Sequence, residues 1–133
     1  MTYADNWRHE TLEILEDQNF GSPVEAPTGM VRRCLELCKT PLDKFSVEDL
    51  RLMIGQKFGL TFLVPLALEH LSKDIFTEGD YFPGDLLANV LAIDNSFWAQ
   101  KKNLWAQLNE LIQDRRIELA SHNISTDLFD AAS

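Results

Sequence analysis

The most apolar stretch of the chain reads Leu60-Thr-Phe-Leu-Val-Pro-Leu-Ala-Leu-Glu-His-Leu-Ser72, and it decides the fold class. Its second half, from Leu66 onward, contains no β-branched residue, which favours a helix over a strand. A proline is least disruptive near the start of a helix, so Pro65 predicts a helix that begins near Thr61. A buried strand over residues 60–64 is the alternative.

Helical patterns flank this stretch on both sides. Thr28 can cap a helix over residues 28–39, and Ser46 opens a capping motif with Asp49 at the third helical position. Gly59 is the expected stop of that second helix. Further helices are expected over residues 6–18, residues 85–91, and from Asp94 or Ser96 to about Ala120.

These elements predict an all-α protein, a compact single-domain bundle of about five to six helices with the longest near the C-terminus. The 133 residues suffice for one hydrophobic core and are too few for two ordinary ones, so residues 1–133 are expected to form one domain. Residues 1–29 would hold the N-terminal helix and a loop. Helical periodicity fades after Ser121, which predicts a frayed or weakly docked tail over residues 121–133.

The charge balance is acidic, with a formal net charge of −9. Such a field repels nucleic acid and phosphate-bearing membranes and favours a basic protein partner, although acidity alone also serves solubility. No apolar run approaches the length of a membrane span, and the start of the chain lacks the pattern of a secretory signal. We therefore expect a cytoplasmic protein that binds neither membrane nor nucleic acid directly.

The sequence offers little for catalysis or for metal binding. Cys34 and Cys38 lie one helical turn apart, too close in sequence for a useful disulfide loop and without neighbouring metal ligands, so both are expected to be buried thiols. No phosphate-binding glycine loop, zinc spacing, nucleophile elbow or calcium loop is present. We predict no catalytic residue, no metal and no cofactor.

Carboxylates gather around the loop that follows the apolar stretch. Their spacing fits no metal template, so loop solvation and helix capping are favoured over metal binding or catalysis. Aromatic residues beside charges of one sign are typical of a protein-binding surface, whereas a Phe-Pro pair often pins a loop to the core, and both arrangements stay open here. The acids are Asp74, Glu78, Asp80 and Asp85, and the aromatic residues are Tyr81 and Phe82.

Three segments in this order resemble a known family. They are Glu48-Asp-Leu-Arg-Leu-Met-Ile-Gly-Gln56, Leu63-Val-Pro-Leu-Ala-Leu-Glu-His-Leu71 and Glu78-Gly-Asp-Tyr-Phe-Pro-Gly-Asp-Leu-Leu87. Over roughly residues 30–112 the chain is similar to immunity proteins of bacterial contact-dependent growth inhibition (CDI) systems, the CdiI family. The resemblance implies a cytosolic protein that is no enzyme and that neutralises the C-terminal toxin domain of a CdiA-type effector by forming a tight complex.

The resemblance carries no binding motif, so the toxin-binding residues are predicted from charge and aromatic placement. The partner is expected to be the cognate toxin domain, basic and nuclease-like, with access of its substrate blocked. The first-choice contact residues are Glu69, Asp74, Glu78, Asp80 and Tyr81, and the second choice is the N-terminal acids Glu10, Glu13, Glu16 and Asp17. The alternatives are a regulatory adaptor for a basic protein segment and a metal-dependent hydrolase that uses the loop carboxylates.

Overall fold

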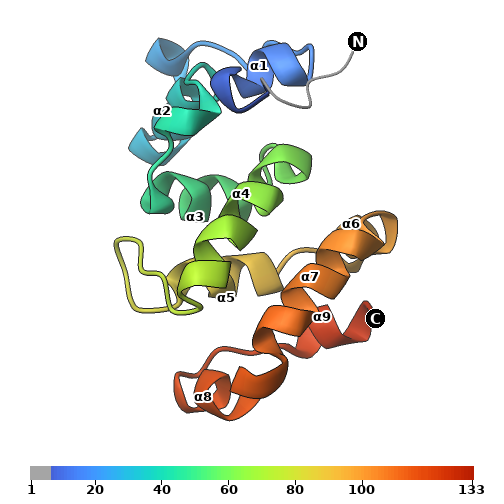
Figure 1. Ribbon diagram of the computed structural model, residues 1–133. Coiled ribbons are helices and arrows are strands. Elements are labelled where there is room, and N and C mark those ends of the chain that lie inside the picture. Colours follow the sequence, from blue (N-terminus) through green and yellow to red (C-terminus); the bar gives the residue numbers. More distant parts are fainter. Residues whose placement is uncertain (1–6) are drawn as a thin grey trace.

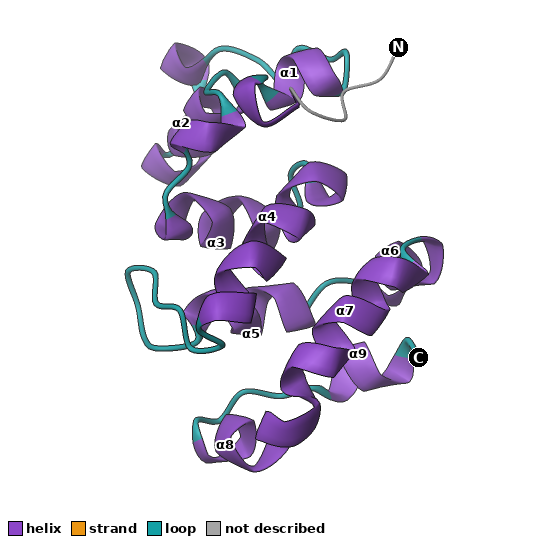
Figure 2. Ribbon diagram, in the orientation of Figure 1, coloured by secondary structure: helices purple, strands orange, loops and turns teal. Residues whose placement is uncertain are grey.

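The computed structural model describes residues 7–133, and every regular element within them is a helix (Figure 1; Figure 2). The α-helices are α1 (Leu12–Leu15), α2 (Gly29–Cys38), α3 (Val47–Gly55), α4 (Leu60–Lys73), α5 (Asp85–Leu91), α6 (Asn95–Gln100), α7 (Lys102–Ile112), α8 (Arg116–Ser121) and α9 (Asp127–Ala131). Four 3-10 turns complete the described elements: η1 (Trp7–His9), η2 (Pro23–Glu25), η3 (Leu42–Lys44) and η4 (Gln113–Arg115). The predicted all-α class is confirmed.

The N-terminal helix is shorter than the sequence predicted. Asn6, where it was expected to begin, lies outside the described residues, and the described part is divided into η1 and α1. Thr11 separates the two because its hydroxyl accepts the N–H of Ile14 at 3.3 Å, which makes it the N-cap of α1. Asp17 takes a left-handed φ of 50° after α1, so the helix cannot continue toward residue 18.

The next two helices begin where their caps predicted. The Thr28 hydroxyl accepts the N–H of Val31 at 3.1 Å at the start of α2. Ser46 and Asp49 form the reciprocal capping box of α3. Arg33 of α2 also donates to the Asp49 carboxylate at 3.0 Å, so the cap residue joins the two helices.

Gly59 ends no helix, contrary to the prediction. Helix α3 stops at Gly55, and the residue in left-handed backbone after it is Lys57, with φ 67°. Gly59 is instead the residue before α4, with φ 56°. A Cβ there would lie 2.5 Å from a methyl of Leu12, so the glycine lets the α3–α4 turn approach α1.

The apolar stretch forms α4, and the strand alternative is wrong. Its buried residues lie on several sides of the helix, as expected for a central element. Pro65 lies inside α4 and lacks the N–H that would bond to the carbonyl of Thr61, an exposed residue in the first turn. In Figure 1, α4 crosses the middle of the molecule between the N-terminal helices and α7.

The predicted long C-terminal helix is interrupted near its start. Lys101 leaves helical geometry, with φ −125° and ψ 55°, and separates α6 from α7. From Lys102 the chain stays helical through α7, η4 and α8 to Ser121, the longest helical run near the C-terminus. The break allows Trp98 of α6 to be fully buried. Short helices such as α6, α8 and α9 explain why the described residues contain more helices than predicted.

The C-terminal tail is docked, so the prediction of a frayed end is wrong. Phe129 of α9 is fully buried and stacks on Trp105, with ring centroids 5.0 Å apart. The Trp105 indole N–H donates to the Phe129 carbonyl at 2.9 Å, and Arg116 of α8 pairs with Asp130 at 2.8 Å. These contacts stabilise α9 without the strong helical periodicity that sequence patterns require.

One continuous cluster of buried apolar side chains extends from Leu12 to Phe129 and joins all these helices. A loop between α4 and α5 lies at the edge of the molecule (Figure 2). Over residues 7–133, none of the helices has the length and apolar character needed to cross a lipid bilayer.

Candidate functional site

The acidic loop comprises residues 74–85, the segment between α4 and α5 together with the first residue of α5. It contains all the first-choice contact residues except Glu69. An isolated antiparallel bridge between Glu78 and Pro83 brings its two sides together. At its base the Asp74 carboxylate accepts the N–H of Phe76 at 2.9 Å, and the Thr77 hydroxyl donates to the Asp74 carbonyl at 2.5 Å. The loop is therefore an ordered turn with its own hydrogen bonds.

Asp85 holds the acidic loop from inside. Its carboxylate is buried and accepts three backbone N–H groups, from Gly79 at 2.6 Å, Tyr81 at 3.0 Å and Phe82 at 3.4 Å. Asp85 is also the first residue of α5, where a negative charge is favourable, as the sequence predicted. It belongs to the framework of the loop and not to its exposed carboxylates.

Helix α3 holds the loop from outside, a contact that the sequence did not reveal. The Glu48 carboxylate accepts the N–H of Asp80 at 2.9 Å and two hydrogen bonds from Arg51, each of 2.7 Å. The Arg51 guanidinium lowers the pKa of Glu48 below its ordinary value. Arg51 also lies over the Tyr81 ring, 4.3 Å from its centroid, which fixes the ring beside α3.

Gly79 allows the two carboxylates to converge on the loop. A Cβ at this position would lie 2.6 Å from the Glu48 Oε1 atom and 3.1 Å from Asp85 Oδ2. No side chain fits between these groups without moving one of them. The sequence signal for this arrangement is the Gly79-Asp-Tyr-Phe-Pro-Gly84 turn, but its partners on α3 are distant in sequence.

The result is a rigid loop that exposes two aromatic residues among acids. Tyr81 is 69% exposed and Phe82 is 45% exposed, so the alternative in which both pack inward is wrong. The side chains of Asp74, Glu78 and Asp80 are exposed as well. Aromatic anchors that lie beside charges of one sign are suited to a basic protein surface.

Glu69 is separated from the acidic loop. It lies on α4, and its carboxylate pairs with the Arg8 guanidinium through both oxygens. Because α4 continues for one more turn before Asp74, the structure brings together only four of the five first-choice residues in one loop.

Of the four N-terminal acids, Glu13 is held by contacts within the fold and only Asp17 is fully exposed. Glu13 pairs with Lys39 at 2.6 Å and accepts the N–H of Phe20 at 3.2 Å, and the hydrogen bond from Lys39 lowers its pKa. Glu16 is half-buried, and desolvation raises its pKa. Glu10 is half-buried too, which leaves Asp17 as the exposed member of this set.

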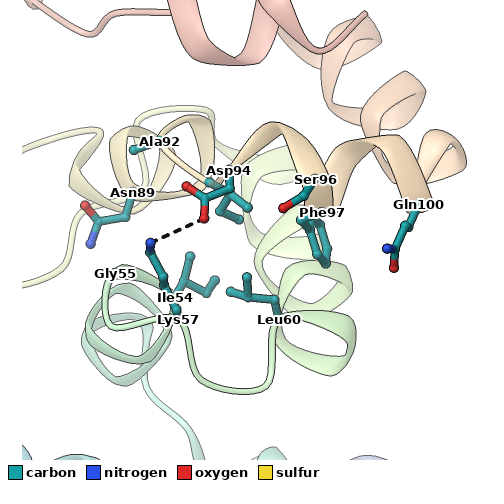
Figure 3. Close-up of a pocket in the computed structure, with 11 residues that line it drawn as sticks. Ile54, Gly55, Lys57, Leu60, Asn89, Ala92, Asp94, Ser96, Phe97 and Gln100 are labelled. Atoms are coloured by element: carbon teal, nitrogen blue, oxygen red, sulfur yellow. Dashed lines mark hydrogen bonds and ion pairs between the residues drawn. The ribbon is translucent and has the colours of Figure 1, made fainter.

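A pocket of about 240 Å³ lies on another part of the surface, between the end of α3 and the turn from α5 to α6 (Figure 3). Ile54, Leu60 and Phe97 supply its apolar wall. Lys57 and Asp94 point toward one another across it, with their charged atoms 3.3 Å apart. Its volume is below the roughly 300 to 1,000 Å³ of typical small-molecule sites.

The remaining candidates for chemistry are the metal-ligating side chains and the two cysteines. Within residues 7–133, no group of three or more His, Cys, Asp or Glu side chains lies close enough to hold a metal ion, so the loop carboxylates form no such cluster. Cys34 and Cys38 are buried free thiols, as predicted. Burial raises the pKa of Cys38 to about 12, which keeps it protonated at neutral pH.

Comparison with known proteins agrees with the resemblance found in the sequence. The model of the family described as CDI immunity proteins matches residues 14–108, a stretch that runs from the end of α1 into α7 and includes α2 to α6 and the whole acidic loop. No curated protein and no solved structure matches the chain. Since the family match covers well over half of the sequence, this chain belongs to the CDI immunity proteins.

Proposed function

We propose that this protein binds the C-terminal toxin domain of a CdiA-type effector through the acidic loop and so neutralises it. The observation that carries the proposal is the exposure of Tyr81 and Phe82 beside Glu78 and Asp80 on a loop held by buried contacts. Membership of the CDI immunity family supports a toxin as the partner.

The rigidity of the loop favours tight binding. A flexible loop would lose conformational entropy when it bound, and this loss weakens affinity. The carboxylates of Asp85 and Glu48 already hold the backbone at Gly79 to Phe82, so little ordering remains to be done. The two aromatic side chains can then act as preformed anchors.

The charge of the chain favours a basic toxin. With a net charge of −9 and three exposed acids on the loop, long-range attraction would speed the encounter with a positively charged nuclease-like domain. The complex would cover the catalytic cleft of the toxin or a surface next to it and exclude the substrate. The protein acts by binding, without a reaction or a cofactor of its own and without direct contact to nucleic acid or membrane.

Co-expression tests this proposal in cells. The toxin fragment encoded beside this gene is expressed with the wild-type protein or with the double variant Glu78→Lys, Asp80→Lys. The wild type should rescue growth and co-purify with the toxin, whereas the double variant should do neither, because two attractive charges become repulsive. The control is Glu25→Lys, an exposed acid on η2 outside the loop, which should rescue fully.

Rescue by the double variant at the level of the wild type would show that the acidic loop is not the contact. The purified proteins give a second readout, because association driven by exposed charges slows as salt rises. An association rate that is the same at low and high ionic strength would contradict the electrostatic part of the proposal.

A further inference from the structure

A groove separates α4 from α7, which lie side by side in the fold (Figure 1). Its volume is about 710 Å³, much larger than the pocket of Figure 3. The apolar lining comes from both helices: Pro65 and Leu68 on α4, and Leu104 and Leu111 on α7. This surface is elongated, because both of its walls are helices.

The rim of the groove is acidic. Glu69 of α4 and Glu110 of α7 line it from opposite walls, together with the neutral side chains of Ser72 and Gln107. Glu110 is exposed, and its side chain forms no hydrogen bond or ion pair with any residue in the described part of the chain. The groove therefore combines an apolar floor with two carboxylates at its edge, of which that of Glu110 has no partner among the described residues.

One carboxylate of the rim already pairs with a cation of the chain itself. Arg8 brings its guanidinium from η1 onto the Glu69 carboxylate and makes two hydrogen bonds to it. The same guanidinium lies 4.6 Å from the centroid of the Trp7 ring. Both Arg8 and Glu69 remain partly exposed, with side-chain exposures of 40% and 53%, so this is a surface pair that another cation can replace.

We propose that the α4–α7 groove is a second contact for the toxin and takes a basic amphipathic helix of that partner. Apolar side chains of the helix would lie on Leu68, Leu104 and Leu111, and basic side chains would pair with Glu110 and displace Arg8 from Glu69. The inference rests on the proposed function, because the occupant is a segment of the same toxin domain.

The dimensions of the groove suit a short helical segment. Leu104 and Leu111 lie seven residues apart on α7, which corresponds to about 10 Å, or two helical turns. A partner helix would fill this length with side chains at positions i, i+3 or i+4, and i+7. The negative rim disfavours nucleic acid and selects a cationic polypeptide.

The groove and the acidic loop are adjacent in sequence at the end of α4. Ser72 lines one end of the groove, and the loop begins two residues later at Asp74. One toxin domain could therefore contact both surfaces at once, since α4 leads from one directly to the other.

Two substitutions block the groove without touching the core. Gln107→Trp places a large ring over the floor, and Glu110→Lys reverses the rim charge; both positions are exposed, so folding should be retained. Affinity for the purified toxin fragment, measured by calorimetry, should fall at least about tenfold in each variant. Glu25→Lys is the matched control and should bind as the wild type does. Melting temperatures of all variants should stay close to that of the wild type.

Arg8→Ala distinguishes a binding role of the groove from a purely structural one. It frees Glu69 for the partner, so the affinity for the toxin should rise, whereas loss of a structural ion pair alone would leave the affinity unchanged or lower. An affinity that does not rise would overturn the displacement of Arg8.

The outcome for the groove is separable from the outcome for the proposed function. If Gln107→Trp and Glu110→Lys bind within about twofold of the wild type while Tyr81→Ala binds weakly, the groove is not a contact and the acidic loop remains one. If the wild-type protein does not bind the toxin fragment at all, the proposed function fails and the groove inference with it.

Discussion

The buried carboxylate of Asp85 lies 2.6 Å from the backbone nitrogen of Gly79, six residues earlier in the chain. This hydrogen bond closes the acidic loop upon the start of α5. It helps to hold a segment rich in charged residues and glycine in one conformation, in which Tyr81 and Phe82 are exposed.

Asp85→Asn should destabilise the protein by about 1 to 3 kcal/mol, because a buried N–H group of the loop loses its charged acceptor. Chemical denaturation measures the change in the free energy of unfolding. Amide hydrogen exchange should also accelerate at Gly79 and Tyr81. The matched control is Asp80→Asn, since the Asp80 side chain is exposed and accepts no hydrogen bond from the residues described. Equal stability of Asp85→Asn and wild type would contradict this role.

Gly79→Ala should destabilise the protein by roughly 1 to 3 kcal/mol, because its Cβ would lie 2.6 Å from Glu48 Oε1 and one carboxylate would have to move. Gly29→Ala is the control. A Cβ on Gly29, in the first turn of α2, meets no atom within 4 Å. That change should be neutral or stabilising by up to about 1 kcal/mol. Thermal unfolding of both variants checks the contrast, which a similar loss in the two would contradict.

Phe129→Ala should cost about 3 to 5 kcal/mol of stability, because it removes a fully buried ring from between Trp98 and Trp105. Its neighbour Leu128 is 52% exposed, and Leu128→Ala should change stability by less than about 0.5 kcal/mol. Denaturant unfolding followed by tryptophan fluorescence compares the two. A loss below about 1 kcal/mol for Phe129→Ala would mean that the tail is only weakly docked.

Sequence patterns predicted contacts between residues close in sequence and missed contacts between residues far apart in sequence. Thr28 and Ser46 were identified as caps because a cap bonds a residue three positions away. The burial of α4 followed from its composition alone. The Glu48 contact with Asp80 joins residues 32 apart, and the Trp105 bond to Phe129 joins residues 24 apart. No local pattern specifies such pairs, so the framework of the loop and the docking of the tail were missed.

The break at Lys101 had a weak signal in the sequence. Residues 100–103 are all polar, so the apolar pattern of the predicted helix is interrupted where the helix divides. The sequence contained no signal for the exposure of Tyr81 and Phe82, because an aromatic loop residue beside a proline can point either inward or outward. Only the positions of Arg51 and Asp85 in space decide it.

Stability should depend on the ionisation of Glu48 in acid. Its folded-state pKa lies below the ordinary value of 4.5, so its carboxylate contributes stability that is present above pH 4.5 and lost as pH falls through the lowered pKa. Glu48→Gln should therefore be less stable than wild type at pH 7, and the difference should shrink as pH falls below 4.5. Unfolding free energies between pH 7 and pH 3 check this. A difference that grows toward low pH would contradict the assigned ion pair with Arg51.

The affinity of the purified toxin fragment for Tyr81→Ala, relative to wild type and to Ile117→Ala, tests the central claim most directly. Ile117 is 89% exposed on α8 and serves as an equally accessible apolar residue outside the acidic loop. If the acidic loop is the toxin contact, Tyr81→Ala should weaken the complex at least tenfold, about 1.4 kcal/mol, and Ile117→Ala should leave it unchanged. Wild-type affinity for Tyr81→Ala, in a protein that still binds its toxin, would contradict it.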